Sequence, residues 1–160
     1  MRIVGVLGCL LVLGACGSEP EVGCTMIGTP VGIGLDVAMP EVRTATMQVC
    51  WDDKCVDPVV ELHPSSSAGP QTCTGTAPTD SCGVSVVPTG GRNGFADVPD
   101  LPTAPVRVTL RLSDANGVVL VDEVLTATPK PAYPNGVECG GQGPQTGLVV
   151  SAAGVVTERT

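Results

Sequence analysis

The sequence predicts an all-β fold: a single domain of two packed antiparallel sheets, stabilised by disulfide bonds. Three observations support this prediction. In several segments every second residue is apolar, which is typical of strands with one buried face. Gly (21) and Pro (15) together supply 36 of the 160 residues and mark frequent turns. The chain also has eight cysteines, enough to cross-link a domain of this size.

Seven strands follow from the alternation. The clearest pattern is VRVTLRL at 106–112, in which valines and leucines occupy every second position. Residues 31–39 and 45–51 alternate in the same way, and no segment keeps the 3.6-residue period of an amphipathic helix. The predicted strands are 31–38, 43–51, 54–62, 82–88, 105–113, 117–127 and 145–157.

Turn signals separate these strands. Asn and Gly adopt positive φ easily, so each Asn-Gly pair predicts a turn. The pairs are Asn93-Gly94, Asn116-Gly117 and Asn135-Gly136. A turn at 114–117 would join two predicted strands as a hairpin. Two further stretches, 64–81 and 129–147, are predicted to be long loops because they are rich in Pro, Gly, Ser and Thr.

The core must be aliphatic, because the chain has only one Trp, one Tyr and one Phe. Val, Leu, Ala, Ile and Met are left to fill it. Trp51 is in phase with the apolar residues of 45–51 and is predicted to pack in the core rather than to stack on a ligand. The roughly 145 residues that follow the signal described below suit one domain.

The stretch VRVTLRLSDANGVVLVDEVL resembles the paired strands of immunoglobulin-like or transthyretin-like sandwich domains in exported bacterial proteins. The resemblance is one of pattern, and the chain lacks the Cys…Trp…Cys spacing of true immunoglobulin domains. It implies a β-sandwich and no particular activity.

The N-terminus has the layout of a secretory signal. Arg2 precedes an apolar run of about a dozen residues, shorter than the roughly 20 that span a bilayer. The residues Leu13-Gly14-Ala15-Cys16 resemble the lipobox of bacterial lipoproteins. That resemblance implies cleavage just before Cys16 and acylation of its thiol. The alternative is an ordinary signal peptide with a cysteine at this place by chance.

The chain would then consist of a signal peptide (1–15), a lipid-anchored tether (16–23) and a β-sandwich domain (24–160). We expect it to be exported and held on a bacterial membrane through the lipid on Cys16, with the choice of membrane left open. Residues 17–23 span at most about 25 Å when extended, so the domain should lie close to the lipid surface.

Six cysteines remain after Cys9 leaves with the signal and Cys16 receives the lipid. They are Cys24, Cys50, Cys55, Cys73, Cys82 and Cys139, and six cysteines can pair in 15 ways. A zinc site is the alternative, but the chain has no CxxC pair and a single His. Disulfides are therefore predicted, with no metal and no cofactor.

A pairing follows partly by elimination. One pair of cysteines flanks a four-residue loop between two predicted strands, where opposed residues lie close enough for a disulfide. A second pair brackets the polar segment TGTAPTDS, which a local bond would order. The predicted disulfides are therefore Cys50–Cys55, lying outside the apolar face, Cys73–Cys82 and, from the two that remain, Cys24–Cys139.

The charge excludes one class of function. Without Arg2, which leaves with the signal, the chain has 7 basic and 16 acidic residues, a formal charge of −9. Nucleic acid and anionic lipid headgroups repel such a chain. Neither nucleic-acid binding nor a basic membrane-docking face is expected.

No catalytic set is evident. Asp52 and Asp53, with Asp57 nearby, lack the spacing that brings six or more oxygens to calcium, so a solvated hairpin tip is predicted for the pair. His63 has no nucleophile motif such as GxSxG to accompany it. The Gly-rich CGGQGPQTG lacks the GK[ST] ending of a phosphate loop. The chain is therefore not expected to be an enzyme.

Tyr133 lies among prolines in the second long loop and is the candidate for an exposed binding contact. The favoured hypothesis is a lipid-anchored envelope protein that presents its sandwich for binding or structural interaction. Its partner would be an envelope protein, polymer or ligand of unknown identity. A structural or solute-binding lipoprotein differs only in that partner. The alternative from another class is an envelope hydrolase with its site in 64–81 and 129–147.

Overall fold

The computed structural model describes residues 23–25, 27–141 and 143–159, which form ten strands and one short 3-10 helix. The strands are β1 (Gly32–Val37), β2 (Thr44–Trp51), β3 (Lys54–Val56), β4 (His63–Cys73), β5 (Cys82–Asp97), β6 (Val106–Ser113), β7 (Val119–Ala127), β8 (Lys130–Ala132), β9 (Gly143–Val150) and β10 (Val156–Glu158). The helix η1 (Val137–Cys139) lies between β8 and β9.

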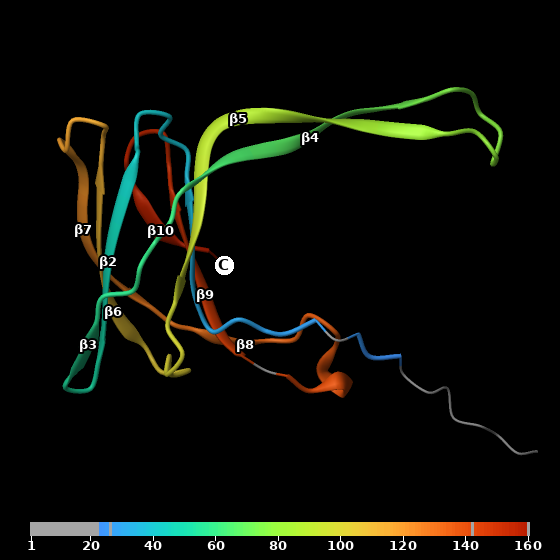
Figure 1. Cartoon of the computed structure of the whole chain (residues 1–160). Coiled ribbons are helices and arrows are strands. Elements are labelled where there is room, and N and C mark those ends of the chain that lie inside the picture. The colour runs from blue at the N-terminus through green and yellow to red at the C-terminus, as the bar shows by residue number, and fades with distance from the viewer. Residues whose placement is uncertain (1–22, 26, 142, 160) are drawn as a thin grey trace, which may run out of the picture.

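The strands make two sheets, which confirms the predicted all-β fold. One sheet has six strands in the order β10-β9-β1-β5-β4, with β8 also paired to β9. The other has four strands in the order β3-β2-β6-β7. Figure 1 shows the two sheets packed as a sandwich, from which β4 and the first half of β5 leave as a long hairpin.

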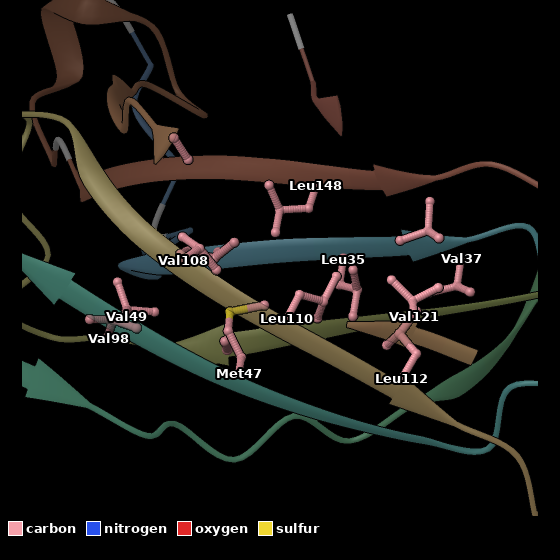
Figure 2. Packing of buried hydrophobic residues seen from close by; sticks show 14 of the residues in the cluster. Leu35, Val37, Met47, Val49, Val98, Val108, Leu110, Leu112, Val121 and Leu148 are labelled. Carbon is pink, nitrogen blue, oxygen red and sulfur yellow. The ribbon is translucent and has the colours of Figure 1, made fainter. Parts of the chain in front are cut away.

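The core between the sheets is aliphatic, as the composition predicts. Ile33 of β1, Leu110 of β6 and Leu148 of β9 are each 0% exposed, and Figure 2 shows such side chains from both sheets meeting in the interior. Trp51 is partly buried against this cluster, which agrees with its predicted place in the core. The buried set of the described residues contains no polar or charged side chain. Every polar or charged side chain of the described residues is therefore at least partly exposed.

One pairing departs from the expected antiparallel architecture. β1 is antiparallel to β5 but parallel to β9, from Gly32 opposite Gln145 to Val37 opposite Val150. Parallel neighbours need a long connection, and here nearly the whole domain lies between the two strands. The six-stranded sheet therefore contains both antiparallel and parallel pairs. The alternation of residues within each strand does not reveal the parallel pair.

Two predicted strands are interrupted. In 54–62 only β3 is a strand, because the chain then crosses to the other sheet, where Val60 forms an isolated bridge with Ala96. The segment 145–157 contains two strands, β9 and β10. Between them Gly154, at φ 79°, donates its N–H to the carbonyl oxygen of Ser151 at 2.9 Å and reverses the chain.

Two of the three predicted Asn-Gly turns are confirmed. Gly117 and Gly136, with φ values of 80° and 90°, close the turns that contain Asn116 and Asn135. The turn predicted at Asn93-Gly94 is wrong, because both residues lie inside β5 opposite β1. A Cβ at Gly94 would lie 2.7 Å from the carbonyl oxygen of Glu61. This glycine allows two backbone segments to cross closely rather than to turn.

The two predicted loops are largely wrong. The segment 64–81 is mostly β4, and only 74–81 remains as a turn before β5. The segment 129–147 contains β8, η1 and the start of β9. β4 buries neither of its faces, so its sequence carries no apolar alternation by which a strand could be recognised.

Candidate functional site

The candidate site is the hairpin formed by residues 65–90, called the arm below. It consists of most of β4, a tip at 74–81 and the first half of β5. Figure 1 shows the arm leaving the six-stranded sheet and extending away from the sandwich. β1 pairs with β5 only from Arg92 to Asp97, so in the arm the one described strand beside β5 is β4.

The arm bends at its base, where the register of β4 against β5 shifts. Pro64 lies opposite Arg92, but Ser66 lies opposite Pro88, so β5 has more residues here than β4. One of them, Gly90, has φ 79°, a conformation that glycine adopts easily. Unequal numbers of residues bend a strand pair. This irregularity turns β5 out of the sandwich.

Hydrogen bonds fix the bend. Arg92 Nε donates to the carbonyl oxygen of Val42 at 2.6 Å, in the connection between β1 and β2. Asn93 Nδ2 donates to Ser65 Oγ at 3.1 Å, and Thr89 Oγ1 donates to the carbonyl oxygen of Ser65 at 3.2 Å. These bonds join β4, β5 and the β1–β2 connection, so the arm leaves the body in a defined direction.

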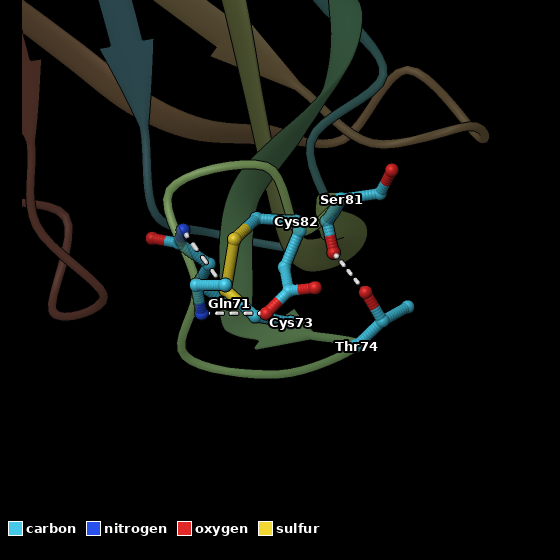
Figure 3. The surroundings of a disulfide bond; sticks show 7 residues. Gln71, Cys73, Thr74, Ser81 and Cys82 are labelled. Atoms are coloured by element: carbon cyan, nitrogen blue, oxygen red, sulfur yellow. Dashed lines mark hydrogen bonds between the residues drawn. A yellow bond between two sulfur atoms is a disulfide. The ribbon is translucent and has the colours of Figure 1, made fainter.

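The tip of the arm is cross-linked. Cys73 and Cys82 lie directly opposite each other and form a disulfide. Beyond it, the N–H of Thr74 donates to the carbonyl oxygen of Ser81 at 3.0 Å. Figure 3 shows the disulfide and the bond from the Thr74 hydroxyl to the same oxygen. Both strands of the arm are therefore held in register at their far end.

The surface of the arm is exposed, nearly uncharged and partly apolar. Every residue of 65–90 is exposed or half-buried. Val84 and Val86 are 50% and 73% exposed. Asp80 is the only charged residue within 64–91. A partner of the arm would be recognised through apolar contact and main-chain hydrogen bonds rather than through charge.

The free edge of β5 in the arm lacks the protection found at other edges of the described sheets. β3, β8 and β10 have three residues each. β7 carries Asp122 and Glu123, and β4 carries Pro64 and Pro70 with register shifts beside them. Short strands, charges, prolines and bulges all hinder edge-to-edge pairing. Residues 82–87 of β5 carry no charge and no proline, and the extra residue of the register shift opposite Val84–Val86 lies in β4, so β5 itself runs on regularly.

A second edge lies on the four-stranded sheet. β3 pairs with β2 only from Val49 to Trp51, so residues 44–48 have no strand beyond them on that side. Residues 57–60 cross this opening and line a groove of about 530 Å³ together with β2. Gln48 Nε2 donates to Asp57 Oδ1 at 3.0 Å and ties the crossing segment to the strand. This edge is therefore partly covered, unlike that of the arm.

The structure pairs the six cysteines as the sequence predicts. The disulfides are Cys24–Cys139, Cys50–Cys55 and Cys73–Cys82, with sequence separations of 115, 5 and 9. The expectation that the second bond lies outside the core is half right, since Cys55 is exposed but Cys50 is only 7% exposed. Cys50 is covered because β2 is an inner strand of its sheet.

Hydrogen bonds reinforce the Cys24–Cys139 bond. Asn135 Nδ2 donates to the carbonyl oxygen of Ile27 at 3.0 Å, and the Thr25 hydroxyl donates to Asn135 Oδ1. The start of the described chain is thereby fastened to the segment between β8 and β9.

Tyr133 belongs to a different surface from the arm. It is half-buried and lines a groove of about 460 Å³ with Ile27, Pro30 and Gln145. Figure 1 shows that this region, next to β8, lies at the opposite end of β1 and β9 from the base of the arm. The structure therefore does not bring the predicted contact residue into the arm, and 74–81 and 133–141 do not form a common site.

The acidic residues and His63 are dispersed. Asp52 and Asp53 form the exposed turn between β2 and β3, as predicted, with Asp52 at φ 48°. His63 begins β4 and lines a groove of about 460 Å³ with Glu61 and Asp97. Across the described ranges, no group of three or more His, Cys, Asp or Glu is placed to hold a metal ion.

Asp114 closes the hairpin predicted at 114–117. Its Oδ1 accepts the N–H of Val118 at 2.9 Å and that of Asn116 at 2.8 Å. These hydrogen bonds, that of Val118 first, lower the pKa of the Asp114 carboxyl below its ordinary value. The carboxylate stabilises the turn between β6 and β7 by accepting these main-chain hydrogen bonds.

Of the arm, only the strand at 82–88 was predicted from the sequence, and it is observed as the start of β5 (Cys82–Asp97), whereas its partner β4 was predicted to be a loop. A Cys73–Cys82 disulfide aligns β4 with β5 on either side of the bond, and the run VSVV at 84–87 favours a strand. The direction of the arm depends on the bend at its base, which brings Arg92 to Val42 across 50 positions of sequence. Such a contact leaves no local pattern.

Comparisons with protein-family models, with curated proteins and with solved structures found no match. The predicted lipid site, Cys16, lies outside the described residues. Of the helices in the described part of the chain, none is long and apolar enough to cross a bilayer. Three disulfides in one small β-domain fit an extracytoplasmic setting.

Proposed function

We propose that this chain is a lipid-anchored extracytoplasmic protein that binds a polypeptide partner through its arm. The partner adds an extended segment as a further strand along the free edge of β5. The observation that carries this proposal is the unprotected edge at 82–87, on a hairpin that contributes nothing to the core. The sandwich is the scaffold from which the arm is presented.

The chemistry of the arm supports strand addition. In this mode main-chain N–H and C=O groups supply affinity, and side chains that alternate along the strand supply specificity. Val84 and Val86 offer exposed apolar contacts for such a partner. An isolated two-stranded hairpin is marginally stable in water, so a third strand would also stabilise the arm. The fixed base and the cross-linked tip reduce the ordering that binding requires.

The N-terminal sequence and the disulfides support the location. Leu13-Gly14-Ala15-Cys16 resembles a lipobox, and the three disulfides suit an oxidising compartment. The likeness of β6 and β7 to immunoglobulin-like or transthyretin-like sandwiches supports a scaffold role and implies no activity. Residues 27–31, which precede β1, lie next to β8, at the opposite end of β1 from the base of the arm. This leaves room for a partner at the arm if the chain is anchored through its N-terminus.

Lipid attachment at Cys16 is tested by metabolic labelling with a fatty-acid analogue. The Cys16→Ser chain should be exported without label, whereas Cys9→Ser should incorporate label as the unaltered chain does. Cys9 lies within the same signal and is a matched control. Equal labelling of Cys16→Ser and the unaltered chain would show that the lipid is elsewhere or absent.

Partner binding is tested by a photoactivatable amino acid placed at Val86 or at Val124. Both are exposed valines, 73% and 60%, on strands with one free edge, but Val124 lies on β7 in the body. In intact cells the variant at position 86 should give crosslinked adducts and the variant at 124 should not. Absence of adducts at 86, or equal adducts at both positions, would refute the role of the arm.

A further inference from the structure

We infer that the partner of the arm is the arm of a second copy of this chain, with the two β5 edges paired antiparallel. This inference rests on the proposed function, which makes the β5 edge the binding edge. The product is a four-stranded sheet in the order β4-β5-β5-β4, shared by the two copies. The same residues contribute from each side, as in a two-fold symmetric interface.

The tip of the arm shows which main-chain groups of β5 face outward. In an antiparallel pair, opposed residues alternate between close pairs without mutual hydrogen bonds, about 4.5 Å apart, and wider hydrogen-bonded pairs, about 5.5 Å apart. Cys73 and Cys82 are 4.0 Å apart at Cα, and the adjoining Thr74 and Ser81 are hydrogen-bonded. The N–H and C=O of Cys82 therefore point away from β4.

The same direction recurs at every second residue of β5. Val84 and Val86 thus also direct their N–H and C=O groups to the free edge. Pro88 follows at the next such position and has no N–H to donate, so it limits pairing at the base of the arm. The available edge is a short run of donors and acceptors from Cys82 to Val86.

This edge is complementary to itself. In one antiparallel register Val84 lies opposite Val86 of the second copy. The outward N–H and C=O groups of each residue can then hydrogen-bond with those of the residue opposite. This register also brings the exposed valines of both copies onto one face of the joined sheet, where they cover each other. In this register Ser85 lies opposite Ser85 of the second copy, in a close pair without mutual hydrogen bonds.

The like charge of two copies is compatible with pairing through the arms. Without the signal, which contains Arg2, the chain has a formal net charge of −9, so two bodies repel each other at short range. Antiparallel arms place the bodies at opposite ends, and an eight-residue strand such as 66–73 spans about 25 Å. That is well beyond the Debye length of about 8 Å at physiological ionic strength. The arms bring only Asp80 of each copy into the contact region.

The lipid anchor would strengthen this contact. An interface of two short strand edges is small for association in dilute solution. Copies held on one membrane meet at a much higher effective concentration than free copies, which raises the paired fraction without new contacts. The test is therefore made on the full chain in the membranes of cells that produce it.

The closing experiment introduces one cysteine into the arm and adds a mild oxidant to these membranes. Ser85→Cys should give a disulfide-linked dimer of twice the monomer mass on a non-reducing gel. Ser67→Cys is the matched control, because Ser67 is equally an exposed serine of the arm but lies on β4. In the proposed sheet the two β4 strands are about 14 Å apart, too far for a disulfide.

A second change tests the edge itself. Adding Val86→Lys to Ser85→Cys places a charge on the edge strand, as Asp122 and Glu123 do on β7. Dimer formation should then be lost, because edge charges hinder pairing. Val86→Thr keeps a β-branched uncharged residue and should retain the dimer. Peptide mapping that shows an intact Cys73–Cys82 bond establishes that the arm is folded in each variant.

The outcomes separate this inference from the proposed function. A Ser85→Cys chain that stays monomeric, or crosslinks no better than Ser67→Cys, overturns the second-copy inference. If the photoactivatable residue at position 86 then captures a different protein, strand addition to the arm stands with another partner. If it captures neither a second copy nor another protein, both proposals fail.

Discussion

β6 and the outer half of β5 are both paired strands, but they differ in what they bury. In β6, Val108, Leu110 and Leu112 are each 0% exposed, and strands lie on both sides. In the arm, Val84 and Val86 are 50% and 73% exposed, and β4 is the one described neighbour. Valine is thus a core residue in one region and a surface residue in the other.

The difference shows that apolar alternation reports burial rather than the presence of a strand. The body is stabilised by the removal of apolar surface from water. The arm is held by its cross-strand pairing, the disulfide at its tip and the hydrogen bonds at its base. Changes in the body should therefore alter global stability, whereas changes in the arm should alter local order and binding.

The largest expected effect comes from the bond that closes the body. Replacing Cys24 and Cys139 together by Ser should lower the free energy of unfolding by about 5 kcal/mol, because the bond closes a loop of more than 100 residues. Replacing Cys50 and Cys55 together should lower it by about 2 kcal/mol. Urea unfolding of the oxidised full chain measures both values. A larger loss for the short loop would reverse the expected order.

The next largest effect is expected from truncating a single side chain in the body, compared with the same kind of truncation in the arm. Leu110→Ala should lower the free energy of unfolding by about 3 kcal/mol, since it leaves a cavity at a fully buried position. Val86→Ala should change it by less than about 0.5 kcal/mol, because the side chain is exposed. The same unfolding measurement serves for both. Similar losses at the two positions would mean that the arm unfolds together with the body.

A smaller effect is expected for the disulfide of the arm. Replacing Cys73 and Cys82 by Ser should leave the unfolding midpoint of the body within the range of surface substitutions, about 0.5 kcal/mol. Proteolysis and amide hydrogen exchange should accelerate within 66–88, where the bond closes a local hairpin. A large drop in the unfolding midpoint would show that the bond stabilises more than the arm.

The smallest effect concerns pH at a turn of the body. The folded-state pKa of Asp114 is lowered from the ordinary 3.8, so its contribution to stability is present above that value and is lost as pH falls through the folded pKa. Asp114→Ala should therefore speed amide exchange at Val118 near neutral pH. The difference from the unaltered chain should shrink in acid below 3.8. A difference that is independent of pH would rule out the carboxylate as its cause.

Strands with a buried face could be predicted from the sequence, and β6 is the clearest case: the predicted strand 105–113 is observed as Val106–Ser113. β4 could not be predicted in this way, because neither of its faces is buried. The parallel pairing of β1 with β9 could not be predicted either, since no local pattern specifies which distant strands become neighbours.

The same distinction between local and long-range information applies to the candidate site. The position of Asp52 and Asp53 at an exposed turn followed from residues close together in sequence. The arm required tertiary information, because its direction depends on the bond from Arg92 to Val42 and on the register shift at its base. The Cys73–Cys82 pairing predicted a local cross-link but not that the cross-link lies at the tip of a long projection.

The Cys24–Cys139 bond has a mechanical consequence. It lies ahead of both β1, which begins at Gly32, and β9, which begins at Gly143, and these strands are parallel neighbours. A pull on the N-terminal chain therefore reaches β1 through the main chain and, through the disulfide, both β9 and β8, which flank Cys139 in sequence. Pulling β1 and β9 out along their length requires all of their hydrogen bonds to neighbouring strands to break together. A single edge strand pulled from one end would instead lose its hydrogen bonds one at a time. A load applied at the N-terminal end would thus be spread over three strands of the six-stranded sheet rather than carried by one edge strand.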